Sequence, residues 1–253
     1  MRIARFKVGN NQIKYGQIFD DYVLEIVNFS YDADSYVYGQ TFSTEKIKLL
    51  APVCPGKVVA LAYNYKDLVG DLGIHQEPLI FLKSPDSVIG PNEAIRIHKG
   101  STTWSEIELA IVIGKECRNV SKEDAKNFIF GYTIANDVTM LNVNNRDHHL
   151  ARSKALDTFC PLGPFVVRNL GTDNLYLNHF IGDKLYQSSN TSNRILNDAE
   201  SVSLVSRFIT LNPGDVLLTG TPKNAMNSVI HNNDLITMEI SHIGTLKNYV
   251  KYK

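Results

Sequence analysis

The sequence predicts a β-rich α+β fold. Three observations support this prediction: many short apolar segments of strand length, frequent turn signals between them, and few long helical patterns. In the second half of the chain, turn signals stand at residues 163–164, 182–183, 213–215 and 220–222. Glycine and proline at such short intervals interrupt helices and separate strands. A doubly wound sheet of alternating strands and helices is therefore not expected.

Residues 1–52 are predicted to form a small N-terminal β module. Residues 2–8 alternate roughly with a period of two and stop at a Gly-Asn-Asn turn signal. Two further short strands are expected at residues 13–19 and 22–26. Residues 46–50 are expected to form a short helix, which the following prolines would end.

Residues 53–253 are predicted to form a second, larger domain. The continuous apolar run at 57–62 suits a buried strand, and 79–83 is a further strand. Residues 64–73 are polar and contain two glycines, so they are expected to form a short helix or a loop. Ser121, followed by acidic residues, is expected to begin a helix as its N-cap.

The composition excludes several classes of protein. The 253 residues are 43% hydrophobic and 21% charged, which excludes global disorder. The 26 basic and 26 acidic side chains cancel, which argues against nucleic acid or an anionic membrane as a partner. No apolar run approaches the roughly 18 residues of a membrane span, and the N-terminus lacks the apolar region of a signal peptide. Three widely spaced cysteines suit a reducing compartment, so a cytoplasmic protein is expected.

Two glutamates, Glu106 and Glu108, stand at the start of a predicted strand. Alternate residues of a strand share a face, so both glutamates lie on the face of Ala110 and Val112. Because both faces are apolar beyond Leu109, the strand is expected to be covered on both sides. Two neighbouring carboxylates in partly dry surroundings raise each other's pKa or recruit a cation.

Asp137 is the candidate third member of this group. It ends a predicted strand and shares a face with the small residues Thr133 and Ala135. If the two strands are neighbours, the three carboxylates converge as hard oxygen ligands, a set that suits Mg²⁺ or Mn²⁺ better than zinc. The alternative is a solvated strand face, the commoner setting of Glu-x-Glu, because spacing alone is a weak signal.

An ordered series of motifs extends over nearly the whole chain. Each is weak alone, but their order and spacing together are specific. They are Asn64-Tyr65-Lys66-Asp67, Phe81-Leu82-Lys83, Glu106-Ile107-Glu108-Leu109, residues 131–139, residues 154–164, Gly182-Asp183 with Gln187 and Thr191, and residues 213–222. This series resembles the fumarylacetoacetate hydrolase (FAH) family.

The resemblance implies a mixed, rolled β-sandwich with a small N-terminal β module, usually as a homodimer, and a catalytic domain at 53–253. It implies that Glu106, Glu108 and Asp137 hold Mg²⁺ or Mn²⁺, which chelates a small 2-oxo or enol carboxylic acid. Family members hydrolyse C–C bonds, decarboxylate, or isomerise such acids, including acids of aromatic compound catabolism. The stretch 157–164 is most similar to the 2-hydroxyhepta-2,4-diene-1,7-dioate isomerase branch.

The same motifs imply roles for further residues. Lys154 is expected to place a positive charge near the substrate carboxylate or to donate a proton, and Lys83 is a second candidate; the alternative for each is a solvated lysine. Arg152 keeps a family position and is expected to bind a substrate carboxylate. Gln187 either binds the substrate or caps a hairpin. Thr219-Gly220-Thr221 aims N–H and hydroxyl groups at a substrate carboxylate, or forms only a tight turn.

Two departures from the family pattern concern the reaction. Hydrolase and decarboxylase members carry a histidine and, three residues on, a glutamate, where this chain has Leu68 and Asp71. Leucine transfers no proton, so Asp71 alone or His75 has to replace the pair, unless His75 is merely solvated. Leu141 stands where the family usually has an arginine. Isomerisation or tautomerisation is therefore favoured over C–C hydrolysis, and the alternative is a relative that binds metal and a small oxo-acid without turnover.

Overall fold

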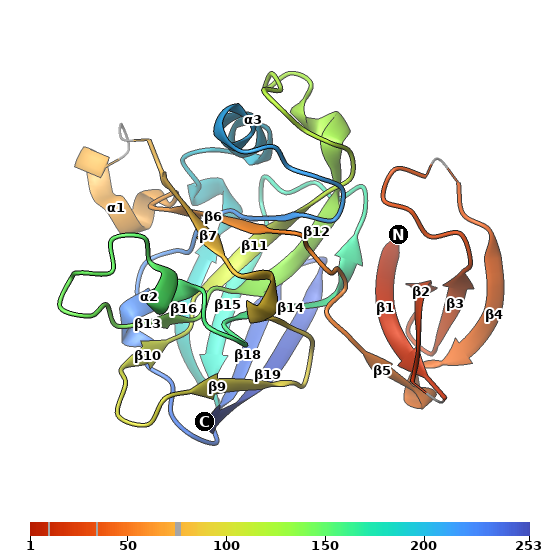
Figure 1. The fold of residues 1–253 in the computed structure, drawn as a ribbon, viewed down its shortest axis with the longest axis horizontal. Helices are drawn as coiled ribbons and strands as arrows, with labels where there is room; N and C mark the ends of the chain where they lie inside the picture. The colour runs from red at the N-terminus through yellow and green to blue at the C-terminus, as the bar shows by residue number, and fades with distance from the viewer. Residues whose placement is uncertain (10, 34, 74–76) are drawn as a thin grey trace.

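The computed structural model describes residues 1–9, 11–33, 35–73 and 77–253. Strands dominate, as Figure 1 shows, and the β-rich α+β prediction is confirmed. The strands are β1 (Arg2–Val8), β2 (Gln12–Ile18), β3 (Tyr22–Ile26), β4 (Tyr38–Ser43), β5 (Ile47–Leu49), β6 (Val58–Ala62), β7 (Leu79–Lys83), β8 (Val88–Ile89), β9 (Ala94–Ile97), β10 (Thr103–Trp104), β11 (Ile107–Ile113), β12 (Ile129–Asn136), β13 (Thr139–Met140), β14 (Cys160–Val167), β15 (Tyr176–Ile181), β16 (Lys184–Asn190), β17 (Val216–Leu218), β18 (Leu235–Ile240) and β19 (Gly244–Tyr252).

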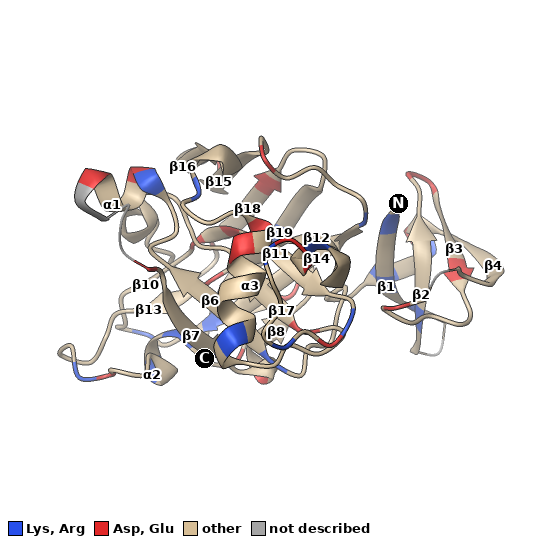
Figure 2. Ribbon diagram, turned by 90° about the horizontal axis from the view of Figure 1, so that it is seen from above, with Lys and Arg blue, Asp and Glu red and all other residues tan. Residues whose placement is uncertain are grey.

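Three α-helices are present among the described residues: α1 (Lys66–Gly73), α2 (Ala151–Lys154) and α3 (Asp198–Phe208). Helix α3 begins with a capping box, in which the Asn197 side chain accepts a hydrogen bond from the Glu200 N–H and the Glu200 carboxylate accepts one from the Asn197 N–H. In the described part of the chain, no helix has the length and apolar character needed to cross a membrane. Acidic and basic residues are interspersed along the ribbon (Figure 2), in keeping with the net charge of zero.

Most strands belong to one large sheet, which has twelve strands within the described residues. Its order is β4-β3-β2-β1-β14-β12-β11-β17-β6-β7, with β5 beside β1 and β8 beside β14. The N-terminal strands, at the right of Figure 1, continue this sheet because β1 pairs antiparallel with β14, Arg2 opposite Val167. The division of the chain between residues 52 and 53 stays a prediction.

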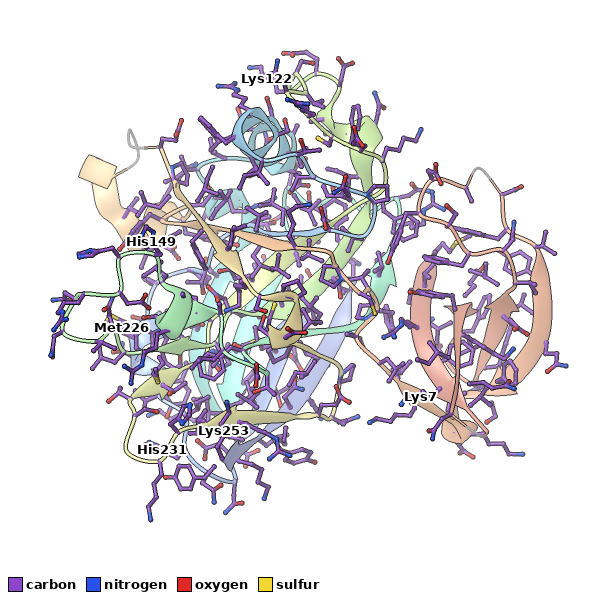
Figure 3. All side chains as sticks on the ribbon, viewed as in Figure 1. Lys7, Lys122, His149, Met226, His231 and Lys253 are labelled. Carbon is purple, nitrogen blue, oxygen red and sulfur yellow. The ribbon has the colours of Figure 1, made fainter. Side chains whose placement is uncertain are left out.

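A five-stranded sheet, β16-β15-β18-β19-β9, covers one face of the large sheet. The main core lies between them and contains Leu109 and Ile111 of β11 together with Met238 of β18. Side chains fill this space in Figure 3. Ala110 and Val112 point to the opposite face, into a second core. Strand β11 is thus covered on both sides, as the sequence predicts, and the face of its even-numbered residues is the one that leads to the two glutamates.

Two sequence-based predictions of helices are wrong. Residues 46–50 form no α-helix: a 3₁₀ turn at Thr44–Lys46 leads into β5, which pairs antiparallel with β1. Pairing with a neighbouring strand outweighs local helix preference here. Ser121 does accept a hydrogen bond from the Asp124 N–H, but only a 3₁₀ turn at Ala125–Phe128 follows, because the chain enters β12 directly afterwards.

Candidate metal and active site

The site lies where the pairing of β11 and β12 is interrupted. Ile107 and Asn136 are the last partners of this ladder. Beyond them, the Asp137 N–H donates to the Glu106 carbonyl at 2.9 Å. The Asn136 side chain replaces a ladder bond, since its Oδ1 accepts from the Glu106 N–H at 3.2 Å. The strands then pair again as β10 and β13.

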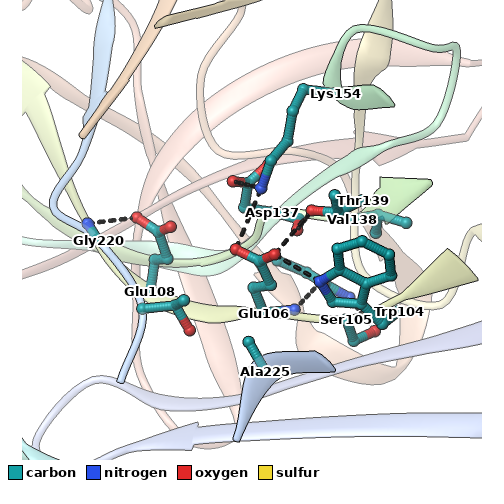
Figure 4. A network of polar contacts seen from close by, with 12 residues as sticks. Trp104, Ser105, Glu106, Glu108, Asp137, Val138, Thr139, Lys154, Gly220 and Ala225 are labelled. Carbon is teal, nitrogen blue, oxygen red and sulfur yellow. Dashed lines mark hydrogen bonds and ion pairs between the residues drawn. The ribbon is translucent and has the colours of Figure 1, made fainter. Parts of the chain in front are cut away.

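This interruption brings Glu106, Glu108 and Asp137 together (Figure 4). One oxygen from each carboxylate lies within 4.8 Å of the others, and all three residues are buried. Strand alternation and the neighbouring of β11 and β12 account for the convergence, as expected from the sequence. Their role as metal ligands stays a prediction.

Two buried lysines balance part of this negative charge. The Lys154 ammonium, at the end of α2, donates to Asp137 Oδ2 at 2.6 Å and to Glu106 Oε2 at 3.1 Å. The Lys83 ammonium donates to Asp137 Oδ1 at 2.5 Å, to the Lys154 carbonyl at 2.5 Å and to the Val138 carbonyl at 3.3 Å. An ammonium has three donors, so protein atoms use all those of Lys83. This geometry favours a supporting role for Lys83 over direct contact with substrate.

The electrostatics of the cluster follow from burial and charge. Burial, together with the carboxylates of Asp137 and Glu106, raises the pKa of Glu108 well above its usual range. Burial alone would raise the pKa of Asp137, but the ammonium groups of Lys154 and Lys83 outweigh it and lower that pKa. Burial alone would lower the pKa of Lys154, but the carboxylates of Asp137 and Glu106 outweigh it and raise that pKa. The sequence-based expectation that a neighbouring carboxylate raises the pKa of a glutamate agrees with the raised pKa of Glu108.

Glu106 receives two hydrogen bonds from residues that the sequence analysis missed. The Trp104 indole N–H donates to Glu106 Oε1 at 2.6 Å, and the Thr139 hydroxyl donates to the same oxygen at 2.8 Å. Strand alternation already places residue 104 on the face of 106 and 108, so a signal for Trp104 was available. Thr139 becomes visible only when β10 and β13 are known to pair.

The loop at residues 219–221 contacts the cluster from the other side. The Gly220 N–H donates to Glu108 Oε2 at 2.6 Å. Gly220 has φ +96°, and a Cβ there would lie 3.0 Å from the Cβ of Asn64. The Asn64 amide in turn donates to the Thr219 carbonyl at 2.9 Å. At least this N–H of the predicted carboxylate-binding turn is therefore used to hold Glu108.

Gln187 joins the same loop to the strand of the glutamates. Its Nε2 donates to Thr221 Oγ1 at 3.1 Å and to the Pro222 carbonyl at 3.0 Å, and its Oε1 accepts from the Ile107 N–H at 3.3 Å. His179 Nδ1 lies 3.1 Å from the same Oε1. Both ends of the Gln187 amide are thus engaged by the protein, an arrangement that favours positioning over substrate binding.

Two further predicted residues, Arg152 and Asp71, lie outside this hydrogen-bonded cluster. Arg152 is exposed on α2, and Asp71 is exposed on α1. His75 lies outside the residues that the structure describes. Leu68, at the position of the missing histidine, is 36% exposed, and Leu141, at the position of the missing arginine, is 52% exposed. The roles predicted for Arg152, Asp71 and His75 stay predictions.

The donor chemistry of the cluster fits a hard divalent cation. It offers three carboxylate oxygens in a buried site, and neither cysteine nor histidine accompanies them in this group. Three carboxylates face two ammonium groups, so with all five groups charged one negative charge is left without a partner. A cation would favour the ionised form of Glu108, which burial disfavours.

Comparison with known proteins identifies the relationship. Residues 57–251 match the model of the fumarylacetoacetate hydrolase C-terminal family. The chain is 37% identical over 225 residues to a mitochondrial oxaloacetate tautomerase of Xenopus laevis, covering 82% of this chain and 70% of the relative. A crystal structure of 5-carboxymethyl-2-hydroxymuconate delta-isomerase from Mycobacterium smegmatis has a TM-score of 0.92 at 34% identity, with both chains covered fully.

A third similar protein is known with ligands. Maleylpyruvate hydrolase from Sphingobium sp. SYK-6, in complex with manganese(II) and pyruvate, has a TM-score of 0.81 at 26% identity, covering 100% of this chain and 99% of that one. The relatives compared are thus isomerases, tautomerases and hydrolases, and the prediction of an enzyme of this type is confirmed. The chain belongs to the fumarylacetoacetate hydrolase family.

Proposed function

We propose that this enzyme catalyses a divalent-cation-dependent tautomerisation or isomerisation of a small 2-oxo dicarboxylic acid. The observation that carries the proposal is the buried cluster of three carboxylates with the Lys154 ammonium at its edge. The likeness to an oxaloacetate tautomerase and to a hydroxymuconate isomerase supports the substrate class. Oxaloacetate and its longer unsaturated analogues share the 2-oxo carboxylate that such a cluster needs.

Glu106, Glu108 and Asp137 would hold the cation. When bound, Mg²⁺ or Mn²⁺ supplies Lewis acidity that stabilises the enolate of a 2-oxo acid. Mg²⁺ is the proposed physiological ion, and the complex of the related maleylpyruvate hydrolase with manganese(II) supports a divalent cation. The surrounding protein contributes a dry environment, because the three carboxylates and both lysines are buried.

Lys154 is the proposed proton-transfer group. Its ammonium lies within hydrogen-bond distance of two of the three carboxylates, and it would donate to an enolate oxygen or a substrate carboxylate bound beside them. Lys83 holds the backbone of Lys154 in position through the Lys154 carbonyl. In the enol-to-keto direction the Lys154 ammonium would donate a proton to C3, and the resulting amine would take the proton from the hydroxyl on C2, so one positioned group can carry both transfers.

The sequence at positions 68 and 71 favours this reaction over C–C hydrolysis. Hydrolysis requires a water molecule to be deprotonated next to the carbonyl carbon, and a positioned base contributes roughly 10² to 10⁴ in rate. Leu68 replaces the family's histidine at that position. Asp71 and His75 are the proposed remaining proton-transfer residues of this segment. We therefore expect tautomerase or isomerase activity to exceed hydrolysis.

The test compares three reactions with one preparation of enzyme. Interconversion of enol and keto oxaloacetate is followed by ultraviolet absorbance with Mg²⁺ or Mn²⁺, and hydrolysis of an acylpyruvate and isomerisation of a hydroxy-diene-dioate are measured in parallel. Free metal ions also catalyse enolisation, so Asp137→Ala protein with the same metal serves as the control. Leu68→His should raise acylpyruvate hydrolysis if Asp71 can partner the new histidine. Hydrolysis by the unmodified enzyme at ordinary rates, roughly 1 to 10³ per second, would refute the assignment.

The second candidate is a protein that binds without turnover. Its support is the absence of the family's proton-transfer pair at residues 68 and 71. In that case, oxalate or pyruvate would bind in the presence of metal, as measured by calorimetry, while none of the three reactions is accelerated. A homodimer and a cytoplasmic location complete the proposal, and sedimentation and fractionation of cells would test them.

A further inference from the structure

The hydrogen bonds around Glu106 come from a small two-stranded sheet. After the interruption between β11 and β12, β10 and β13 pair with Trp104 opposite Thr139. Both residues are buried, at 8% and 4% exposure. The register therefore places an indole N–H and a hydroxyl next to each other, beside the carboxylate of Glu106 (Figure 4).

Both groups donate a hydrogen bond to the same oxygen of Glu106, Oε1. The indole N–H is 2.6 Å and the hydroxyl 2.8 Å from Oε1, whereas Oε2 contacts the Lys154 ammonium at 3.1 Å. A carboxylate oxygen has about two lone-pair directions, and two donors occupy them. Oε1 is consequently engaged, and Oε2 is the oxygen that Glu106 can offer to a cation.

Each of the other two carboxylates also has one oxygen bound by the protein outside the cluster. Glu108 Oε2 accepts the Gly220 N–H and Asp137 Oδ1 accepts from Lys83, whereas Asp137 Oδ2 shares the Lys154 ammonium with Glu106 Oε2. One oxygen of each of the three residues lies within 4.8 Å of the others. Three single-oxygen ligands leave half of the six positions that Mg²⁺ or Mn²⁺ prefers. A chelating substrate and water need those positions.

We propose that Trp104, together with Thr139, is a positioning residue that holds Glu106 as a single-oxygen ligand of the cation. This inference rests on the proposed metal-dependent function and deepens it. Both groups are uncharged donors, and the indole N–H cannot accept a hydrogen bond. Such outer partners of metal ligands typically contribute 10- to 100-fold to metal affinity.

The test is calorimetric titration of the metal-free protein with Mn²⁺. Trp104→Phe removes the indole N–H and keeps an aromatic ring, and Thr139→Val removes the hydroxyl at nearly constant volume. Thr139→Ser keeps the hydroxyl and serves as the conservative variant. The matched control is Thr133→Val on β12, where the buried hydroxyl donates to the Gly163 carbonyl and not to a ligand. Thermal unfolding of each variant verifies that it is folded.

Trp104 also supplies an optical readout, because it is the only tryptophan of the chain. Paramagnetic Mn²⁺ should quench its fluorescence in the unmodified protein, in Thr139→Ser and in Thr133→Val, at the concentrations found by calorimetry. Quenching that saturates with the calorimetric affinity places the ion beside this indole.

The expected result is a roughly 10- to 100-fold loss of Mn²⁺ affinity in both Trp104→Phe and Thr139→Val, with Thr139→Ser and Thr133→Val near the unmodified value. Unchanged affinity in Trp104→Phe and Thr139→Val would overturn the positioning role while leaving the metal site intact. Failure of the unmodified protein to bind Mn²⁺ would overturn both this inference and the proposed function. The two failures are thus distinguished by the first titration.

Discussion

Replacing Lys154 by methionine should strengthen the binding of divalent cations. The Lys154 ammonium contacts Asp137 Oδ2 and Glu106 Oε2, which are two of the oxygens that face the centre of the cluster. A divalent cation needs the same oxygens, so the ammonium competes with it. Methionine keeps an unbranched apolar side chain of similar length and removes the charge.

The size of the effect follows from the two distances. At 2.6 and 3.1 Å and an effective dielectric constant of about 20, each contact contributes about 5 to 6 kcal/mol of Coulomb attraction, much of which the burial of the charges offsets. Removing one partner of a buried ion pair costs roughly 3–5 kcal/mol because the other charge is left uncompensated. A bound cation compensates that charge. If cation binding recovers only about 1.4 kcal/mol of the lost stability, the affinity for the cation rises tenfold.

Calorimetric titration with Mn²⁺ at constant pH and ionic strength measures this change. Arg152→Met is the matched control, since it removes one positive charge from an exposed position of the same helix, α2. We expect at least about tenfold tighter binding in Lys154→Met and little change in Arg152→Met. Thermal unfolding should show a metal-free Lys154→Met protein that is less stable and that Mn²⁺ stabilises more than the unmodified protein. Equal or weaker Mn²⁺ binding in Lys154→Met would show that the ammonium does not compete for the oxygens.

Three further predictions follow from the site and the core. Asp137→Ala should weaken Mn²⁺ binding at least about tenfold, because one of three charged ligands is lost, and unchanged calorimetric affinity would contradict its assignment. Gly220→Ala should lower the free energy of unfolding, measured in urea, by about 1–3 kcal/mol, because φ is +96° and the new Cβ meets Asn64. Gly171→Ala is the control: no atom lies within 4 Å of its Cβ, so the free energy of unfolding should change by less than about 0.5 kcal/mol. Burial lowers the pKa of His179 to about 4. Because an unfolded histidine takes up a proton near pH 6.5 and the folded one does not, stability should fall by up to about 3 kcal/mol from pH 6.5 to 4, and His179→Gln should remove that part of the urea-unfolding profile.

Strand patterns and family motifs predicted much of the fold. Leu79–Lys83 forms the predicted strand residue for residue, and β1 to β3 agree with prediction to within one residue at each end. The failures at residues 46–50 and after Ser121 have one cause. Residues 47–49 form a strand because they pair with β1, and the turn after Ser121 stays short because β12 begins directly after it. Neither neighbouring strand can be recognised from the short segment itself.

The carboxylates of the site could be predicted because they come from paired neighbouring strands. Alternation fixed the face of Glu106 and Glu108, and the motif order indicated Asp137. The use of each hydrogen-bond donor could not be predicted in this way. Gln187 and Gly220 belong to recognisable motifs, yet both donate hydrogen bonds to protein atoms, the Pro222 carbonyl and Glu108 Oε2. Only tertiary contacts determine which donor meets which oxygen.

The reaction type and the cation site depend on different parts of the structure. The three carboxylates and Lys83 lie on or next to buried strands, whose core packing fixes them. Leu68 and Leu141, which depart from the family pattern, are 36% and 52% exposed on α1 and after β13, and neither belongs to the buried core clusters. Exchange of a proton-transfer residue at such positions costs little stability, so the reaction can change while the site for the cation persists. This separation makes residues 68 and 141 the positions at which the reaction of this chain should be altered by substitution.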